Sequence, residues 1–310
     1  MRETLSVVVP VWGEKELVRL LYDRLVSALK QLPVDYTLIY VDDCCPFGSG
    51  VELDKLTEID NNVRVIHLSR NFGEAVAVKA GIDACDSDWV VVMDCDLQDR
   101  PEDIIAFYNK AKEGYDVVWG ERVEREDKLS KKFLSNAFYF VNNILSEKKV
   151  EKKIGSFSLI SRKVVEGLKK INTYTFNYIQ MVEFLGYKKA YVPIVKAKRE
   201  LGKSGYNIIK GTALALNIMV STSGRLLLIP IISSAVFFLI SFLYAAIQLY
   251  NILFNDDMLA SEYNIMIFLM LFLTSFFFLN LSILGIYTGI ILREVLQKPR
   301  YIVNEQKGKI

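Results

Sequence analysis

Two long stretches without a charged residue constrain this chain more than any other feature of its sequence. Leu226 to Tyr250 and Ile265 to Leu292 contain no Asp, Glu, Lys or Arg and are rich in Phe, Leu and Ile. Because a helix rises about 1.5 Å per residue, each stretch is longer than the roughly 30 Å hydrocarbon core of a bilayer. Buried core helices are the alternative, but uncharged runs of this length favour a hairpin of two transmembrane helices.

The charges around these stretches predict their orientation. The connection from Asn251 to Asn264 carries three acids and neither Lys nor Arg. Basic residues flank the hairpin on its outer sides, at Lys203, Lys210, Arg225, Arg293, Lys298, Arg300, Lys307 and Lys309. Since basic loops stay in the cytoplasm, we expect a multi-pass protein of the cell inner (plasma) membrane with both termini cytoplasmic.

The first two hundred residues alternate between strand and helix patterns. Strands are predicted at 5–10, 36–41, 63–68, 89–93, 116–120, 154–161 and 187–196. Helices are predicted at 14–30, 51–60, 70–85, 101–113 and 164–171. This alternation predicts an α/β fold with a Rossmann-like, mostly parallel sheet and right-handed crossovers.

An acidic segment follows one of the most apolar of these strands. Asp94-Cys95-Asp96-Leu97-Gln98-Asp99 comes directly after Trp89 to Met93 and precedes Pro101. Open α/β sheets bind ligands at the carboxyl ends of their strands. Two carboxylates two residues apart, with an amide close by, offer hard oxygen ligands for Mg²⁺ or Mn²⁺. Acids are common in loops after strands, so this motif indicates a metal site only in combination with other motifs of the chain.

Other polar segments should meet the acidic segment at the same sheet edge. Residues 10–14 follow the first strand and Asp42-Asp43 end the second, so all three segments should converge on a nucleotide-type site. No G-x-G-x-x-G motif or Walker lysine follows the first strand, which argues against dinucleotide binding and ATP-driven motors.

Composition excludes several other classes of function. The formal net charge is +2, so nothing in the charge balance argues for nucleic acid binding. His67 is the single histidine and lies in a strand-like run, where a packed residue is the better interpretation. Four cysteines without a C-x-x-C pair, and no further histidine, argue against a zinc site and a Ser-His-Asp triad.

Four segments are expected along the chain. Residues 1–204 are expected to form a cytoplasmic head, and 205–225 mix apolar and basic residues in a way typical of helices at the membrane surface. The transmembrane hairpin occupies 226–292, and 293–310 form a basic cytoplasmic tail.

Several ordered motifs together resemble a known family. They are a Pro-x-x-x-Glu turn at Pro10 to Glu14, Asp42-Asp43, Ser-Arg-Asn-Phe-Gly at 69–73, and Asp-x-Asp-Leu-Gln-Asp-x-Pro-Glu at 94–102. The chain resembles glycosyltransferase family 2, and within it the polyprenyl-phosphate glycosyltransferases, such as dolichyl-phosphate mannose synthases and bacterial undecaprenyl-phosphate sugar transferases. The resemblance implies a GT-A fold, a nucleotide-sugar donor, a divalent metal (Mg²⁺ or Mn²⁺) and inversion at the anomeric carbon.

The resemblance also implies partners for the reaction. The donor is expected to be UDP-linked, the acceptor is a polyprenyl phosphate, and the two C-terminal helices anchor the head to the lipid bilayer. Relatives suggest a homo-tetramer. The product would serve synthesis or modification of a cell-envelope glycan.

Roles for individual donor-side residues follow from the same resemblance. Around the nucleobase and ribose it implies Pro10, Val11, Trp12 and Glu14. Asp42 or Asp43 would also contact the nucleoside, and Asp94 would lie beside the donor sugar or the ribose.

The metal and phosphate groups complete the implied site. The resemblance implies that Asp96 and Gln98 hold the cation. It also implies that Asp94, Asp96 and Arg122 are the catalytic residues. The acceptor phosphate and the donor diphosphate would be bound by Arg122, Arg199, Lys203 and Ser204. Arg70 opens a helix whose N-terminus adds a favourable dipole for the donor's charge, and a structural salt bridge is its alternative role.

The chain departs from the family at one place that bears on mechanism. Ser156-Phe157-Ser158-Leu159 stands where many relatives have Asp-Phe-Arg-Leu, so no acid occupies that position. A phosphate monoester has a second pKa of about 6 and arrives largely ionised, so it needs little help from a general base.

Two alternatives remain at this point. A processive polysaccharide synthase shares the fold but carries a Gln-x-x-Arg-Trp motif ahead of its pore-forming spans, whereas Gln297-Lys298-Pro299-Arg300-Tyr301 lies after the last span here. A non-catalytic membrane scaffold is the second alternative, and the intact Asp94, Asp96 and Gln98 argue against it.

Overall fold

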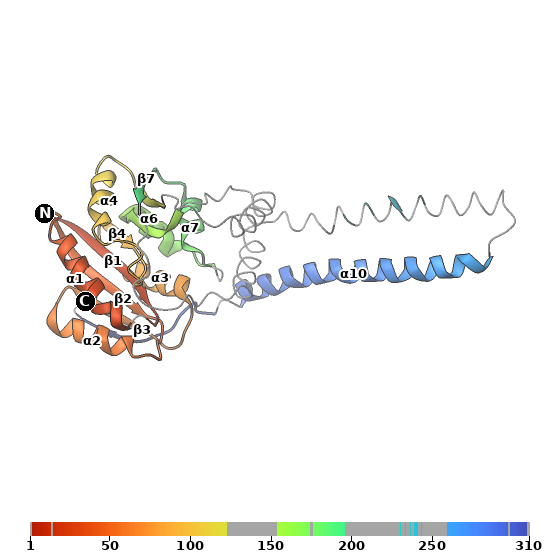
Figure 1. The fold of residues 1–310 in the computed structure, drawn as a ribbon, viewed down its shortest axis with the longest axis horizontal. Coiled ribbons are helices and arrows are strands. Elements are labelled where there is room, and N and C mark those ends of the chain that lie inside the picture. Colours follow the sequence, from red (N-terminus) through yellow and green to blue (C-terminus); the bar gives the residue numbers. More distant parts are fainter. Residues whose placement is uncertain are drawn as a thin grey trace. The chain divides into compact units, whose positions relative to one another are not determined.

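The chain forms two compact units in the computed structural model (Figure 1). The structure describes residues 2–13, 15–122, 154–173, 176–195, 259–296 and 298–308, and the separate positions 230, 233, 236, 239, 240 and 243. The first unit, the sheet unit, comprises Met1–Lys128, Glu151–Gly205 and Lys298–Ile310. The second comprises Leu129–Val150 and Tyr206–Gln297.

A twisted sheet forms the centre of the sheet unit. Its strands, in spatial order, are β7 (Lys189–Ile194), β5 (Val117–Arg122), β6 (Ile154–Ser161), β4 (Trp89–Val92), β1 (Glu3–Val11), β2 (Val34–Asp42), β3 (Val63–Leu68) and β8 (Val303–Lys307). Strands β6 and β8 are antiparallel to their neighbours, and the other described pairings are parallel. The predicted α/β fold is confirmed, and its sheet is mixed, with parallel and antiparallel pairings.

Helices cover both faces of this sheet because successive strand residues point to opposite sides. On β1, Val7 and Val9 pack into one buried cluster and Val8 into the other. The first cluster contains side chains of α1 (Lys15–Leu29), α2 (Ser49–Ile59) and α4 (Asp103–Ala111). The second contains side chains of α3 (Glu74–Asp83), α6 (Arg162–Lys170) and α7 (Tyr178–Leu185).

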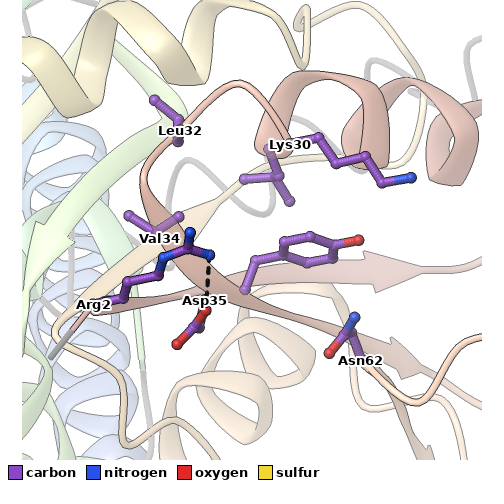
Figure 2. Close-up of a pocket in the computed structure, with 8 residues that line it drawn as sticks. Arg2, Lys30, Leu32, Val34, Asp35 and Asn62 are labelled. Carbon is purple, nitrogen blue, oxygen red and sulfur yellow. Dashed lines mark ion pairs between the residues drawn. The ribbon is translucent and has the colours of Figure 1, made fainter.

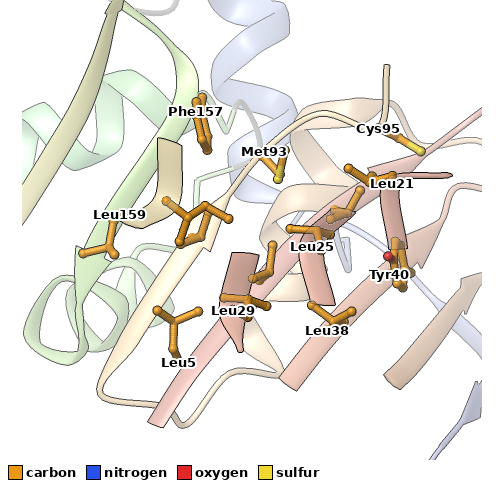
Figure 3. Close-up of a cluster of buried hydrophobic side chains, with 14 of the residues drawn as sticks. Leu5, Leu21, Leu25, Leu29, Leu38, Tyr40, Met93, Cys95, Phe157 and Leu159 are labelled. Atoms are coloured by element: carbon orange, nitrogen blue, oxygen red, sulfur yellow. The ribbon is translucent and has the colours of Figure 1, made fainter. Parts of the chain in front are cut away.

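The first cluster shows why the helices hold their places (Figure 3). Leu21, Leu25 and Leu29 repeat at helical spacing along α1 and are fully buried in the same cluster as Leu38 of β2. Each such side chain contributes roughly 1.5–3 kcal/mol by leaving water. On the other face, Gly81 lets α3 approach β1, since a Cβ there would collide with the side chain of Val8. This packing fixes the strand ends that carry the polar segments.

The last strand lies within the segment predicted as a basic tail, 293–310. From Lys298 onwards this segment belongs to the sheet unit, and β8 pairs with β3. The segment ahead of β8 is also held, because Tyr301 Oη donates to Asp83 Oδ2 at 3.0 Å and Arg300 Nη2 donates to the Ile171 carbonyl at 2.9 Å. Lysines at a sheet edge protect it from pairing with other chains, which explains why this strand is so polar.

The second unit contains one long described helix, α10 (Leu259–Val295), into which the expected second span falls. Within it, Phe272–Leu292 is long and apolar enough to cross a membrane, and it is the only such helix among the described residues. Of the expected first span, only separate positions between 230 and 243 are described. One of them, Ser233, donates to Asn280 Oδ1 at 3.1 Å, which brings that position beside α10. The interfacial helices expected over 205–225 lie outside the described residues.

Candidate functional site

The predicted site residues gather where the parallel strands end. Strand β4 runs into the acidic segment, β1 into Trp12 and Gly13, and β2 into Asp43. Strand β6 runs the opposite way, so its first residues reach the same edge, where Ile154 pairs with Glu121 of β5. The sheet therefore brings five strand ends together, as expected for a ligand site in an open α/β sheet.

A hollow of about 370 Å³ lies at the other end of the sheet, where β1 and β2 begin (Figure 2). It is lined by Arg2, Leu29, Lys30, Leu32, Val34, Asp35, Tyr36 and Asn62. Arg2 Nη1 and Asp35 Oδ1 form an ion pair of 3.9 Å in it. None of the predicted site residues lines this hollow, so it is separate from the candidate site.

The acidic segment presents alternate side chains to the site. Asp94, Asp96 and Gln98 are partly exposed, whereas Cys95, Leu97 and Asp99 between them are buried. Leu97 adopts a left-handed backbone conformation with φ of 56°, which costs energy for a side chain with a Cβ and indicates a tightly specified loop. The Gln98 backbone N–H donates to Asp96 Oδ1 at 3.1 Å and fixes that carboxylate.

Asp94 is held by the strand that runs against the others. Ser156 Oγ, near the start of β6, donates to Asp94 Oδ1 at 3.1 Å. The neighbouring Ser158 is fully buried and is within 2.7 Å of the Tyr178 hydroxyl, so it belongs to the core beneath the site. Ser156 therefore faces the site, whereas Ser158 packs in the core of the sheet unit.

Arg122, at the end of β5, occupies a space that a glycine leaves open. A Cβ on Gly155 would lie 2.5 Å from Arg122 Nη2 and 3.2 Å from its Cζ. The Arg122 Nε is buried and has no hydrogen-bond partner among the described residues. A guanidinium is always charged and costs free energy when its donors are unmet, so this position suits an anion.

The loops after β1 and β2 meet through aromatic and sulfur contacts. The rings of Trp12 and Phe47 pack edge to face at 5.8 Å, and both side chains are about half exposed or more. The Gly13 N–H donates to Cys45 Sγ at 3.2 Å. Of the residues implied around the nucleobase, Pro10 and Val11 are buried within β1, so Trp12 is the described one that offers an exposed surface.

Asp42, the last residue of β2, and Asp43, which follows it, already have protein partners. Asp42 Oδ1 accepts from the Cys45 N–H at 3.0 Å. Asp43 accepts from the N–H groups of Phe72 and Gly73 at 2.7 and 2.8 Å, which holds the loop that leads into α3. Burial raises the pKa of Asp43 although these two backbone donors act against the rise. Both acids thus shape the loops of the site.

Arg70 lies on the loop ahead of α3, close enough to Asp43 to influence its charge. Its guanidinium stacks on the Phe72 ring at 4.0 Å and donates to the Asn71 carbonyl at 3.2 Å. Its positive charge lowers the pKa of Asp43, against the larger effect of burial. The side chain is exposed, so it can still meet an incoming anion.

Four predicted residues lie outside the described part of the chain. They are Glu14, Arg199, Lys203 and Ser204. Their roles remain predictions from the resemblance.

The structure adds four residues to the site that the sequence interpretation did not single out for it. They are Cys45, Phe47, His67 and Gly155. The sequence around Phe47 could have indicated a binding role, because an aromatic residue in a Pro-Phe-Gly turn does not readily pack into the core. The contacts of Gly155 and His67 join segments far apart in the sequence, so no local pattern announces them.

The acidic segment offers a suitable donor set for a divalent cation. Asp96 and Gln98 supply a carboxylate and an amide oxygen from alternate positions on the open side of one loop. No cluster of three acids, histidines or cysteines suited to a metal arises among the described residues. Mg²⁺ is commonly held by one or two carboxylates together with substrate phosphates, so a sparse protein set fits a cation that arrives with its nucleotide.

Comparison with known proteins decides the family. The model of glycosyl transferase family 2 matches residues 6–168, which contain the five strand ends of the candidate site. The chain belongs to glycosyl transferase family 2. It is therefore a glycosyltransferase, and the non-catalytic scaffold raised by the sequence is set aside.

Family 2 relatives match over nearly the whole chain. The uncharacterized glycosyltransferase YkcC of Bacillus subtilis is 31% identical over 304 residues, covering 98% of this chain and 94% of the relative. The bactoprenol glucosyl transferase of Shigella phage SfX is 30% identical over 305 residues, covering 98% and 99%. The undecaprenyl-phosphate 4-deoxy-4-formamido-L-arabinose transferase of Photorhabdus laumondii is 29% identical over 310 residues, covering 98% and 94%.

Solved structures of other sugar-transferring enzymes share the fold. Glucosyl-3-phosphoglycerate synthase of Mycobacterium tuberculosis, in complex with phosphoglyceric acid, aligns with a TM-score of 0.52 at 17% identity over 72% of this chain and 80% of that one. The same enzyme with Mn²⁺, uridine-diphosphate-glucose and phosphoglyceric acid aligns with a TM-score of 0.50 at 16% identity, over 70% and 78%. At this identity the likeness concerns the fold alone, and it supports the GT-A class implied by the sequence motifs.

Proposed function

We propose that this chain transfers a sugar from a nucleotide-sugar donor, UDP-linked, to a polyprenyl phosphate at the cytoplasmic face of the membrane. The transfer inverts the anomeric carbon, because the acceptor phosphate displaces the nucleoside diphosphate in a single step. The observation that carries this proposal is the loop after β4, where Asp94, Asp96 and Gln98 alternate with buried residues. The full-length relatives named as undecaprenyl-phosphate and bactoprenol transferases support the acceptor class.

The donor would lie across the carboxyl ends of β1, β2 and β4. The exposed Trp12 and Phe47 rings offer an apolar surface suited to a nucleobase. Asp96 and Gln98 would hold a Mg²⁺ or Mn²⁺ ion, and Asp94, oriented by Ser156, would accept hydrogen bonds from sugar or ribose hydroxyls. When bound, such a cation neutralises charge on the departing diphosphate.

Arg122 contributes a second positive charge. Its guanidinium is held beside Gly155 in a partly buried position, where electrostatic attraction is stronger than in bulk water. A charge fixed before the reaction costs no reorganisation as the phosphate–sugar bond breaks. We therefore assign Arg122 to the phosphates of donor and acceptor, together with Arg199, Lys203 and Ser204 beyond the described residues.

The acceptor explains the absence of an acid at position 156. A phosphate monoester with a second pKa of about 6 is largely a dianion at neutral pH, so its oxygen attacks without losing a proton. Ser156 and Ser158 have hydroxyls that do not ionise in the neutral range and are already engaged with Asp94 and Tyr178. This arrangement fits an ionised acceptor better than a sugar hydroxyl.

The membrane segments fit the same acceptor. A polyprenyl phosphate keeps its chain in the bilayer and its head group at the surface, so an enzyme that uses it must itself stay at the membrane. The apolar helix Phe272–Leu292 would provide such an anchor, and 226–250 would provide the second span.

A product assay tests the proposal. Full-length protein in detergent is incubated with Mn²⁺ or Mg²⁺, a short polyprenyl phosphate and each of a panel of UDP-, GDP- and dTDP-sugars, and lipid products are identified by mass spectrometry. We expect one donor to add a single sugar unit to the lipid phosphate. A ladder of added sugars, or no lipid product with any donor, would each contradict the proposal, and the ladder would indicate the processive synthase.

A further inference from the structure

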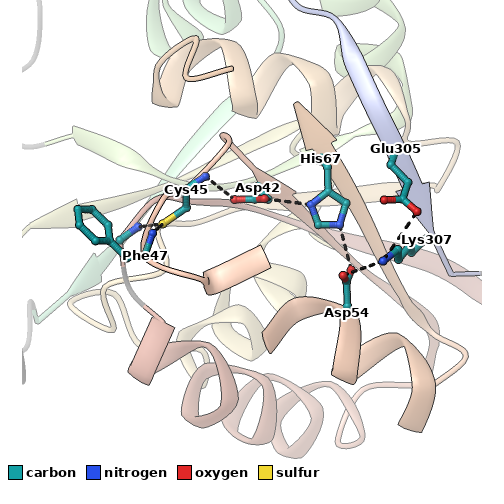
Figure 4. A network of polar contacts seen from close by, with 8 residues as sticks. Asp42, Cys45, Phe47, Asp54, His67, Glu305 and Lys307 are labelled. Carbon is teal, nitrogen blue, oxygen red and sulfur yellow. Dashed lines mark hydrogen bonds and ion pairs between the residues drawn. The ribbon is translucent and has the colours of Figure 1, made fainter. Parts of the chain in front are cut away.

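A path of polar contacts runs from the last strand of the sheet unit to the loop after β2 (Figure 4). Lys307 Nζ on β8 pairs with Asp54 Oδ2 of α2 at 2.7 Å. Asp54 Oδ1 lies 3.0 Å from His67 Nε2, and His67 Nδ1 lies 2.9 Å from Asp42 Oδ2. Asp42 Oδ1 accepts from the Cys45 N–H at 3.0 Å, so the path joins β8 to the loop after β2 without a break.

The far end of this path holds the surface assigned to the nucleobase. Cys45 Sγ accepts from the N–H of Gly13 at 3.2 Å and from the N–H of Phe47 at 3.4 Å. The first contact ties the loop after β1 to residues 42–47, the β2 loop, and the second holds Phe47 against Cys45 within that loop. The edge contact between Trp12 and Phe47 lies across the same junction. Moving Cys45 would therefore move both aromatic rings.

Both ring nitrogens of His67 face carboxylate oxygens, of Asp42 and of Asp54. An ionised carboxylate only accepts hydrogen bonds, so the protonated imidazole is the form that donates to both acids. The hydrogen bond with Asp42 accordingly raises the pKa of His67, with Asp54 adding to the rise against the effect of burial. Lys307 and Glu305 of β8 lie next to the same cluster, and they balance one another's charge.

The space for this ion pair is built into the first turn of α2. A Cβ on Gly50 would lie 2.7 Å from Asp42 Oδ2 and 3.3 Å from His67 Cε1. Gly50 is not in a left-handed conformation, so backbone freedom does not account for a glycine here. The missing side chain instead allows the carboxylate and the imidazole to meet beside the helix.

We propose that His67 is a positioning residue for donor binding, which, with Asp54 and Lys307, holds Asp42 so that the β2 loop keeps Phe47 and Trp12 in place. The assignment of those rings to a nucleobase rests on the proposed function. Strand β8 follows α10 in the chain, so the segment after the apolar helix takes a direct part in shaping the donor site. The C-terminal residues thus do more than cover the edge of β3.

A pair of substitutions separates positioning from packing. In His67→Asn the amide nitrogen lies close to the place of Nδ1 and keeps a donor for Asp42. In His67→Gln the amide nitrogen reaches the place of Nε2 and contacts Asp54 instead. Both variants lose the charge and have similar volume, so they differ mainly in whether Asp42 keeps its hydrogen bond.

Steady-state kinetics of the full chain in detergent provide the first measurement. We expect His67→Gln to raise the KM for the donor about tenfold, the equivalent of about 1.4 kcal/mol, with kcat and the KM for the polyprenyl phosphate little changed. His67→Asn should restore most of the donor affinity. Lys307→Ala should raise the donor KM by about threefold, whereas Lys110→Ala, which breaks the surface pair with Glu113, should leave it unchanged.

Hydrogen exchange tests the positioning without any donor. We expect the backbone amides of Cys45 and Phe47 to exchange about tenfold faster in His67→Gln than in wild type, and at near wild-type rates in His67→Asn. Equal effects of the two substitutions on exchange, or an unchanged donor KM in His67→Gln, would overturn the proposal. If no donor in the panel reacts with wild-type protein but the exchange rates differ as expected, the transfer reaction fails and the positioning role stands.

Discussion

Ser156 Oγ donates a 3.1 Å hydrogen bond to Asp94 Oδ1, and this contact joins two strands that run in opposite directions at the centre of the site. The resemblance drawn from the motifs implies an acid at this position in many relatives. Two facing carboxylates repel and raise the pKa of one of them, whereas a serine hydroxyl orients Asp94 without adding a second negative charge. The serine thus suits a reaction in which Asp94 binds hydroxyls and no proton is removed there.

Removing this hydroxyl should weaken catalysis by a modest amount. A hydrogen bond to a charged group contributes about 1.5–3 kcal/mol at most, and water can replace part of it at a partly exposed site, so we expect Ser156→Ala to lower kcat/KM about tenfold. Ser156→Thr keeps the hydroxyl and should retain most of the activity. Kinetics with saturating acceptor and varied donor give kcat/KM for each variant.

The matched control lies on the same strand. Ser161 Oγ donates to Asp116 Oδ1 at 3.0 Å, at the opposite end of β6 from Ser156. Ser161→Ala removes the same kind of hydrogen bond away from the site, and should change thermal stability without changing kcat/KM. A loss of activity as large as that of Ser156→Ala would mean that the strand as a whole, and not the Asp94 contact, matters.

Sugar transfer should depend on a divalent cation that Asp96 helps to bind. Because Asp96 would supply a carboxylate ligand on the open side of the loop, we expect Asp96→Ala to lower transfer by at least about a hundredfold while the melting temperature stays close to wild type. Treatment with a chelator should abolish wild-type activity, and added Mn²⁺ or Mg²⁺ should restore it. Asp86→Ala, which breaks an exposed pair with Lys169, serves as the control. Chelator-resistant turnover would contradict the metal assignment.

The close approach of Arg122 to Gly155 predicts that substitutions at the two positions have non-additive effects. A Cβ at position 155 would lie 2.5 Å from Arg122 Nη2, so Gly155→Ala must displace the guanidinium. We expect Gly155→Ala and Arg122→Ala each to lower kcat/KM strongly, and the double variant to be no worse than Arg122→Ala alone. Such non-additivity is expected for residues in direct contact and is measured by a double-mutant cycle. Independent, additive losses would show that Gly155 acts through something other than Arg122.

Local sequence patterns predict most of the described elements but not the direction of each strand. The range predicted for β6, 154–161, agrees with Ile154–Ser161, yet its apolar pattern is the same for a parallel and an antiparallel strand. Helix α7 is absent from the sequence prediction, although Asn177 caps its start by accepting from the Gln180 N–H at 3.1 Å and Gly186 ends it in a left-handed conformation. Those two residues are the signals that reveal this helix.

The site shows a similar division. The acidic loop is visible in the sequence because its chemistry lies in consecutive residues, and Asp94 to Asp99 come directly after an apolar strand. The partners of Asp42 and Asp43 are not visible there, since His67 and the backbone of Phe72 and Gly73 come from later segments. Contacts of this kind depend on the folded sheet, and only the structure supplies them.

The paired carboxylates around His67 should make stability depend on pH. The pKa of His67 is raised in the folded state, first by the hydrogen bond with Asp42, above the unfolded value of about 6.5. Its contribution to stability is therefore complete below about pH 6.5 and is lost as the pH rises through the folded-state pKa. Melting temperatures of full-length wild type and His67→Asn in detergent, measured between about pH 6 and pH 9, test this. We expect the advantage of wild type to be largest at the acidic end and to shrink steadily towards the alkaline end. An advantage that stays constant or grows with pH would mean that His67 is neutral in the folded protein and donates to only one of its two carboxylates.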